Sequence, residues 1–260
     1  MPYLDTHTHL DQAEFDADRQ AVIERSRRAG VESFICVGIS AHSSRAAVSL
    51  AEEYPEIRAA VGIHPNYCAE AAVDHWRQIV AMAADPQVVA LGETGLDRHW
   101  DFAPAELQRD YFDRHLRLAQ EIDLPVIVHC REAETDLLPM LRRAAARGPL
   151  RGVVHAFSGD AAMAAECLAL GLHIGFAGTV TYRNKKFRAL RELAATIPED
   201  RLLIETDSPY LVPHPLRGKL KRNEPANVLL VADALAELRG ISVAELADRT
   251  TANAARLFFS

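Results

Sequence analysis

The stretch VVALGE at residues 88–93 shows the pattern that decides the fold: a short apolar, β-branched run that ends in an ionisable side chain. The same pattern recurs in PVIVH (125–129), GVVH (152–155) and LLIETD (202–207). Short runs rich in β-branched residues predict β-strands. Extended outward along the chain, the pattern predicts eight strands: Leu4–His9, Ser33–Gly38, Arg58–His64, Val88–Glu93, Pro125–His129, Gly152–Phe157, Leu172–Phe176 and Leu202–Asp207.

The segments between these runs carry the start and stop signals of helices. Pro104 suits the first turn of a helix, and Asp160 can cap a helix that Gly171 closes. Ser242 and Glu245 form a capping box. These signals predict helices over Arg19–Ala29, Ser43–Tyr54, 104–122, 160–171 and 225–240, and a last one that begins after Ser242.

The alternation of strands and helices predicts a parallel sheet with right-handed crossovers. Eight such units within 260 residues fit a (β/α)₈ barrel, the TIM-barrel fold, which is typically about 250 residues long. The alternative is a doubly wound open sheet, but its GxGxxG fingerprint is absent from the sequence. No linker composition interrupts the chain, so we expect one domain over residues 1–260.

Composition narrows the class of protein. A hydrophobic fraction of 49% excludes wholesale disorder, and 29 basic against 36 acidic residues argues against a nucleic-acid binder that relies on a broad positive surface. The four cysteines are far apart and form no CxxC pair, as expected of free thiols in a reducing compartment. With no leader pattern and no apolar run of membrane-spanning length, we expect a cytoplasmic protein with no membrane and no obligate protein partner.

Six ionisable residues occupy positions that suit metal binding. His7 and His9 are two residues apart on one strand and so share a face, although two polar residues facing water would show the same spacing. The other four end four different strands, and the carboxyl ends of barrel strands converge on one face. The sequence therefore predicts a metal site formed by His7, His9, Glu93, His129, His155 and Asp207.

The number of ligands indicates two ions. Four histidines and two carboxylates exceed what one tetrahedral ion with an open position needs. A carboxylate can bridge two ions through its two oxygens, and Glu93 is the better candidate for the bridge. Two ions about 3.5–4 Å apart are used to clamp a phosphoryl centre. Mixed nitrogen and oxygen ligands suit Zn, Mn, Fe or Co better than Ca, and leave Mg possible.

Seven motifs along the chain resemble those of the TatD family of metal-dependent hydrolases, known as TatD-type deoxyribonucleases. They are DTHTHLD (5–11), VGIHP (61–65), GETGLD (92–97), LPVIVHCREA (124–133), GVVHAFSG (152–159), LLIETDSPYL (202–211) and RNEP (222–225).

The resemblance implies an amidohydrolase-like TIM barrel that hydrolyses phosphodiesters, most often at DNA ends as a 3'-5' exonuclease. It also implies two divalent ions (Mg, Zn or Mn), with His7, His9 and Asp207 on one ion, His129 and His155 on the other, and Glu93 as the bridge.

Three of the predicted strand-end residues are candidates for direct or supporting roles in catalysis besides Glu93. Asp207 can accept a proton from the attacking water. Glu205 points to the same face one layer deeper, where it accepts an N–H from a ligand histidine or, alternatively, pairs with a buried Arg or Lys. His64 either contacts the scissile phosphate or holds the adjacent His-Pro turn.

Basic residues near the predicted mouth are candidates for phosphate binding. Arg131 lies two residues beyond His129, and the loop after the eighth strand carries four cations. The alternative for these four is a solvated loop. Trp100 and Tyr182 are candidates for stacking on bases, with packing at the rim or core as the alternative. The predicted substrate-binding residues are Arg131, Arg217, Lys219, Lys221 and Arg222.

Two other functions stay open from the sequence. The same barrel and ligand types serve metal-dependent hydrolysis of a small phosphoester, a lactone or an amide, because a fold does not fix a reaction. A non-enzymatic barrel that only binds is the second alternative. The presence of all six ligand residues argues against it.

Overall fold

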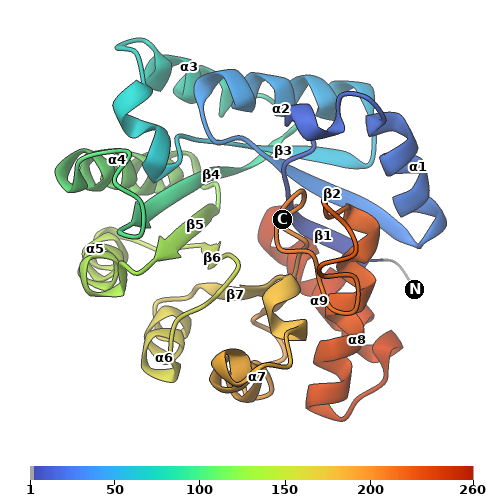
Figure 1. Cartoon of the computed structure of the whole chain (residues 1–260). Helices are drawn as coiled ribbons and strands as arrows, with labels where there is room; N and C mark the ends of the chain where they lie inside the picture. The colour runs from blue at the N-terminus through green and yellow to red at the C-terminus, as the bar shows by residue number, and fades with distance from the viewer. Residues whose placement is uncertain (1–2, 260) are drawn as a thin grey trace.

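The computed structural model describes residues 3–259, and its eight parallel strands neighbour one another in chain order (Figure 1). Each predicted strand is present, which confirms the barrel and rules out the doubly wound sheet, whose strand order would reverse. The strands are β1 (Tyr3–Thr8), β2 (Val31–Val37), β3 (Ile57–Val61), β4 (Val88–Asp97), β5 (Val126–Arg131), β6 (Gly152–Val154), β7 (His173–Phe176) and β8 (Leu202–Ile204).

The helices lie around the outside of the strands (Figure 1). They are α1 (Arg19–Arg28), α2 (Ala41–Glu53), α3 (His75–Met82), α4 (Ala105–Ile122), α5 (Glu134–Arg147), α6 (Ala161–Ala169), α7 (Arg188–Ala194), α8 (Val228–Arg239) and α9 (Val243–Phe258). The short 3₁₀ segments are η1 (Ala13–Phe15), η2 (Pro65–Glu70), η3 (Gly178–Thr181), η4 (Lys185–Phe187) and η5 (Pro225–Asn227).

The predicted capping residues Asp160 and Ser242 and the predicted terminal glycine Gly240 lie at helix ends. The helices α3, α5 and α7 were not predicted from the sequence. The Asp160 side chain accepts a hydrogen bond from the backbone N–H of Met163, and Ser242 accepts one from Glu245. Gly240 ends α8 at a φ of 66°. The helices α3, α5 and α7 have no side-chain cap, which they share with α1, α4 and α8, and α5 carries a proline within it.

Backbone hydrogen bonds close the barrel between β1 and the segment that follows β8. Asp207 N–H donates to the carbonyl of His7 at 2.9 Å, and His9 N–H donates to the carbonyl of Ser208 at 2.8 Å. The backbone of three predicted ligands thus joins β1 to the segment after β8, and Thr8 and Ser208 form a bridge between them.

The apolar layer beneath the predicted site alternates with the ligands along the strands. Ile127, Val153 and Leu203 are almost completely buried and lie two residues before His129, His155 and Glu205. They belong to a cluster that α9 completes with Leu257 and Phe258. The polar side chains at the strand ends therefore pack on a layer of buried apolar side chains.

One glycine permits β4 and β5 to approach closely next to the site. Gly95 has a φ of 143°, and a Cβ there would lie 2.0 Å from the carbonyl oxygen of His129. Any side chain at this position would push β4 away from β5 and so separate Glu93 from His129.

None of the helices within residues 3–259 is long and apolar enough to cross a membrane, and the four cysteines are free.

Candidate metal centre

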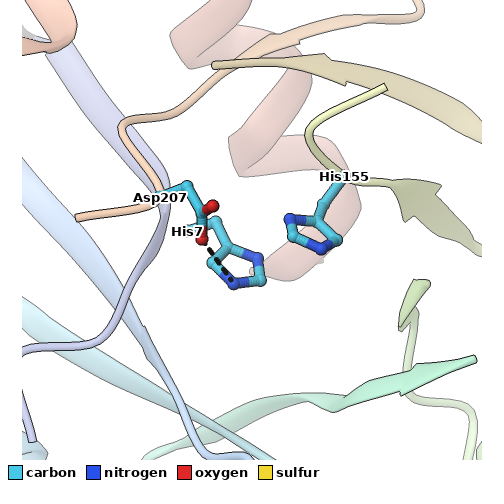
Figure 2. A group of neighbouring side chains, drawn as sticks. All are labelled: His7, His155 and Asp207. Carbon is cyan, nitrogen blue, oxygen red and sulfur yellow. Dashed lines mark ion pairs between the residues drawn. The ribbon is translucent and has the colours of Figure 1, made fainter. Parts of the chain in front are cut away.

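The structure brings all six predicted ligands together at the carboxyl ends of the strands. They come from β1, β4 and β5, from the residues that directly follow β1 and β6, and from the third residue after β8. Figure 2 shows His7, His155 and Asp207 grouped around one space although they are far apart in the sequence. A cavity of about 540 Å³ opens above them, and five of the six line it, with His7 buried beneath.

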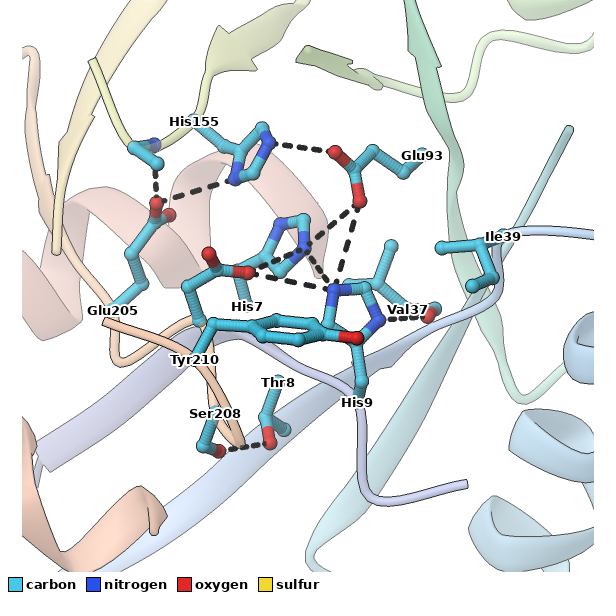
Figure 3. Close-up of polar contacts among 12 residues, drawn as sticks. His7, Thr8, His9, Val37, Ile39, Glu93, His155, Glu205, Ser208 and Tyr210 are labelled. Carbon is cyan, nitrogen blue, oxygen red and sulfur yellow. Dashed lines mark hydrogen bonds and ion pairs between the residues drawn. The ribbon is translucent and has the colours of Figure 1, made fainter. Parts of the chain in front are cut away.

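The first group of ligand atoms comes from His7, His9, Glu93 and Asp207. The Nε2 atoms of the two histidines are 3.2 Å apart. Glu93 Oε2 lies 3.4 Å from His7 Nε2 and 3.6 Å from His9 Nε2. Asp207 Oδ1 lies 3.7 and 3.4 Å from the same two nitrogens (Figure 3). Four donor atoms thus converge on one point.

The second group forms around the other oxygen of Glu93. Glu93 Oε1 lies 2.8 Å from His129 Nδ1 and 2.8 Å from His155 Nε2, and these two nitrogens are 3.4 Å apart. Figure 3 shows one Glu93 oxygen directed at His155 and the other at His7 and His9. Each oxygen of one carboxylate therefore faces a different pair of imidazoles, which is the arrangement a bridging ligand needs.

The hydrogen bonds made by the outer ring nitrogens of His9 and His129 leave the other nitrogen of each ring available to a metal ion. His9 Nδ1 donates to the Val37 carbonyl at 2.8 Å, which leaves the Nε2 lone pair directed into the first group. His129 Nε2 is 3.1 Å from Asp97 Oδ2, which leaves Nδ1 free for the second group. A ligand histidine commonly donates its other N–H to a carbonyl or carboxylate. The chemistry of both groups therefore fits divalent metal ions.

The pKa shifts of the candidate ligands are consistent with binding of a cation. Burial raises the pKa of Glu93, but His155 and His64 more than compensate and hold it well below its usual range. Burial lowers the pKa of His9, yet Asp207 and Glu93 outweigh burial and raise it to about 9. Without metal, Glu93 stays ionised and His9 holds a proton that a cation would displace.

Glu205 lies under His155, as predicted for a supporting residue. Its Oε1 is 3.5 Å from His155 Nδ1 and also accepts the backbone N–H of Ala156 (Figure 3). Thr6 donates to Glu205 Oε2 at 3.3 Å. A Cβ at Gly175 would lie 2.7 Å from that oxygen, so the glycine provides the space. Within residues 3–259 no arginine or lysine pairs with Glu205, so the alternative reading was wrong.

His64 performs the structural role that we considered and also reaches the cavity. Its Nδ1 accepts the backbone N–H of Asn66 at 3.1 Å, which holds the turn after β3. The proton of the neutral ring therefore resides on Nε2, which lies 3.4 Å from Glu93 Oε1. In this tautomer His64 offers the cavity an N–H donor rather than a lone pair. Its contact with a phosphate stays a prediction.

Two buried aspartates that position candidate ligands, Asp97 and Asp5, were not predicted from the sequence. Asp97 holds His129 and, through Oδ2, also accepts from Asn66 Nδ2 at 3.2 Å. Asp5 is fully buried and accepts from the backbone N–H of His7 at 3.3 Å and from the Thr206 hydroxyl at 2.6 Å. Burial raises the pKa of Asp5 to about 8. Both residues belong to motifs quoted above. The signal that could have identified them is an ionisable side chain on the same strand as a candidate ligand.

The predicted substrate-binding residues separate into two sets. Arg131 lines the cavity. Arg222 instead pairs with Asp18 at 2.7 and 2.9 Å, and its guanidinium is further held by Glu224. Of the described residues that line the cavity, none is a cation of the loop after β8, which holds Arg217, Lys219, Lys221 and Arg222.

The two aromatic residues considered for base stacking also differ. Tyr182 is buried, its hydroxyl donates to the Val212 carbonyl at 3.0 Å, and Arg217 lies 4.1 Å over its ring. Packing therefore covers the Tyr182 ring, which is the alternative given for it in the sequence analysis. Trp100 lines the cavity and is 46% exposed.

A parallel β/α barrel with histidines and carboxylates gathered at its strand ends is the architecture of the amidohydrolase-like metal-dependent hydrolases. Comparison with known proteins narrows the class. The family model described as TatD related DNase matches residues 4–259, and the chain belongs to this family. It is therefore an enzyme, a metal-dependent hydrolase that acts on ester bonds.

Its relatives are similar over nearly their whole length. An uncharacterized metal-dependent hydrolase, YabD, of Bacillus subtilis is 41% identical over 98% of both chains. A protein of Citrobacter rodentium named 3'-5' ssDNA/RNA exonuclease TatD is 39% identical over 98% of this chain and 97% of its own. The crystal structure of the TatD homologue YJJV of Escherichia coli superposes with a TM-score of 0.91 at 34% identity, covering 99% and 98% of the two chains.

Proposed function

We propose that this enzyme is a divalent-metal-dependent nuclease that removes nucleotides from the 3' end of single-stranded DNA. The observation that carries the proposal is the geometry of Glu93, whose two oxygens each face a separate pair of histidines. A two-ion centre of this kind suits in-line displacement at phosphorus. The relative named as a 3'-5' ssDNA/RNA exonuclease supports the choice of substrate.

The residues divide between two cations as their distances suggest. His7, His9 and Asp207 would hold one, His129 and His155 the other, and Glu93 both. A bound pair of divalent ions lowers the pKa of water and polarises a phosphoryl oxygen. With Mg, Mn or Zn in place, the local charge becomes attractive to a phosphate despite the acidic chain.

Asp207 is the proton acceptor of this scheme. Its Oδ1 faces His7 and His9 at 3.7 and 3.4 Å, and the side chain lines the cavity. Burial opposes ionisation, but the hydrogen bond from His9 and the charge of His7 lower the pKa of Asp207. The carboxylate is thus ionised near neutral pH and takes a proton from the attacking water as the oxygen of that water bonds to phosphorus. The bond from phosphorus to the 3' oxygen of the shortened strand breaks, and this oxygen takes a proton from solvent.

His64 contributes a hydrogen bond to the reacting phosphate. Its Nε2–H points into the cavity beside Glu93, and the backbone of Asn66 fixes the orientation of the ring. A fixed donor next to developing negative charge stabilises the transition state without reorganisation.

A metal-reconstituted cleavage assay tests the function. Metal-stripped protein receives Mg, Mn or Zn and is incubated with single-stranded DNA labelled at the 5' or the 3' end. We expect stepwise shortening of the 5'-labelled strand, early release of the 3' label, and loss of more than a hundredfold in rate for Glu93→Ala.

Glu52→Ala is the matched control, because Glu52 is exposed on α2. Equal rates for Glu93→Ala and the wild type would refute the bridging role. Turnover of a small phosphoester, a lactone or an amide without cleavage of DNA would move the substrate to the alternative class.

A further inference from the structure

Two exposed aromatic rings stand at the rim of the cavity. Trp100 and Phe102 are 46% and 60% exposed, and both follow the end of β4. Their rings are stacked, with centroids 5.4 Å apart and planes inclined by 13°. Apolar rings exposed together beside a polar centre form a flat apolar surface that is open to solvent.

The Trp100–Phe102 pair is continuous with the candidate metal centre. Trp100 lines the same cavity as Glu93 and His129. The guanidinium of Arg131, which also lines the cavity, lies 5.6 Å from the centroid of the Trp100 ring. Within the part of the chain that the structure describes, no carboxylate pairs with Arg131. A flat apolar surface and an available cation thus lie side by side at the mouth.

Several contacts hold this rim in place. Asp97 Oδ1 accepts the backbone N–H groups of His99 at 2.8 Å and Trp100 at 3.1 Å. His99 Nδ1 lies 2.8 Å from Glu132 Oε1, and the His99 ring meets Trp100 edge-on at 4.8 Å. The aromatic pair is therefore positioned before any ligand arrives, which lowers the entropic cost of binding.

We infer that the Trp100–Phe102 pair is a stacking subsite for an unpaired nucleobase of the strand whose phosphate lies at the metal centre. Arg131 neutralises a phosphate next to that base. A flat ring surface accepts any base, because every base has a π-face. The inference rests on the proposed nuclease function and extends it: recognition includes the base, and it requires a strand whose bases are free of a duplex.

Tryptophan fluorescence provides a direct test, because the chain has only two tryptophans. Trp76 packs against Tyr111 and His115, so Trp76→Phe leaves Trp100 as the single reporter. The manganese-loaded variant is titrated with a cleavage-resistant phosphorothioate oligothymidylate and with an abasic phosphorothioate strand of equal length. We expect the base-bearing strand to quench the emission and the abasic strand to leave it nearly unchanged. Equal responses to both strands would overturn the inference.

The KM values for base-bearing and abasic strands give a second readout. Trp100→Ala is expected to reduce the preference for base-bearing over abasic strands, expressed as the ratio of their KM values, by about five- to a hundredfold. Trp100→Phe retains a ring and should restore most of the preference. Phe259→Ala removes an exposed aromatic side chain that does not line the cavity and serves as the control. An unchanged ratio in Trp100→Ala would contradict the stacking role.

The two proposals fail in different ways. If neither DNA nor RNA is cleaved with any divalent ion but base-dependent quenching persists, the nuclease function is wrong and the base site stands as a binding site. If cleavage proceeds without base-dependent quenching and with an unchanged KM ratio, the subsite is wrong and the nuclease function stands.

Discussion

Asp97 holds His129 with one oxygen of its carboxylate, Oδ2, at 3.1 Å from Nε2, and with the other it holds the turn that carries Trp100. One buried side chain thus connects a candidate ligand to the aromatic rim. Burial opposes its ionisation, but the hydrogen bond and charge of His129 lower the pKa of Asp97. The contact with His129 and the contact with the turn use different oxygens, so a substitution at Asp97 can remove one contact and keep the other.

Asp97→Asn should weaken metal binding and leave the rim intact. The amide oxygen can still accept the two backbone N–H groups, whereas an amide nitrogen facing His129 and Asn66 no longer accepts from either. We expect metal affinity to fall by about 10- to 100-fold. Calorimetric titration with Mn or Zn measures the loss. Asn66→Ala removes only the other donor to Oδ2 and should have a much smaller effect; equal losses in both variants would contradict this role of Asp97.

Asp207→Asn should separate metal binding from proton transfer. The amide retains an oxygen where Oδ1 faces His7 and His9, but it cannot accept a proton at neutral pH. At saturating metal we expect kcat on single-stranded DNA to fall by about 10²- to 10⁴-fold. Metal content by mass spectrometry confirms that the site is filled. A metal-loaded variant with full turnover would exclude Asp207 as the acceptor.

His115 should make the free energy of unfolding depend on pH. Its Nδ1–H donates to the Tyr111 carbonyl at 2.7 Å and its Nε2 accepts from Ile63 N–H at 3.1 Å, so the buried ring is satisfied only when neutral. Burial lowers the pKa of His115 to about 4. The unfolded chain binds the proton near pH 6.5, so this stabilisation is complete above that pH and is lost as the pH falls toward 4.

The loss amounts to at most about 1.4 kcal/mol per pH unit for each such histidine. Urea unfolding of metal-stripped protein between pH 7 and 4.5 measures it. His115→Gln should flatten the slope, because the amide does not titrate, whereas His42→Gln on the exposed face of α2 should leave it unchanged. Parallel slopes for the wild type and His115→Gln would contradict the assignment.

Arg222 should contribute more to folding than to phosphate binding. It joins Asp18 to Glu224 and lies 4.6 Å over the buried ring of Phe15. We expect Arg222→Ala to lower the free energy of unfolding by about 1 kcal/mol, with Lys221→Ala as the exposed neighbour for comparison. If Arg222 bound a phosphate instead, its removal would reduce the salt dependence of oligonucleotide affinity by about one unit of slope.

The six candidate ligands are far apart in the sequence, but their convergence could be predicted because it follows from two regular features of the fold. Side chains alternate along a strand, and parallel barrel strands end on one face. Glu93 and His129 follow from these rules alone. Asp97 does not, since β4 extends through Leu96 and Asp97 past the point at which the apolar run ends. Register shifts in β4 also alter which residues face each other.

Pairings between loops could not be predicted in this way. Asp18 and Arg222 are 204 positions apart, and no periodic pattern connects them. The burial of Tyr182 depends likewise on Val212 and Arg217, which pack on it from another loop. The missed helices α3 and α7 are short and begin without a capping side chain, so their existence depends on packing against the barrel.

The closure of the barrel also completes the candidate metal centre. Thr8 and Ser208, which meet where the barrel closes, are 200 positions apart, so a growing polypeptide has His7 and His9 long before it has Asp207. Until the last strand docks, those histidines lack the carboxylate that completes their group. On the proposed assignment of the ligands, a chain still on the ribosome therefore carries an incomplete centre, and we expect hydrolytic activity only from the finished fold.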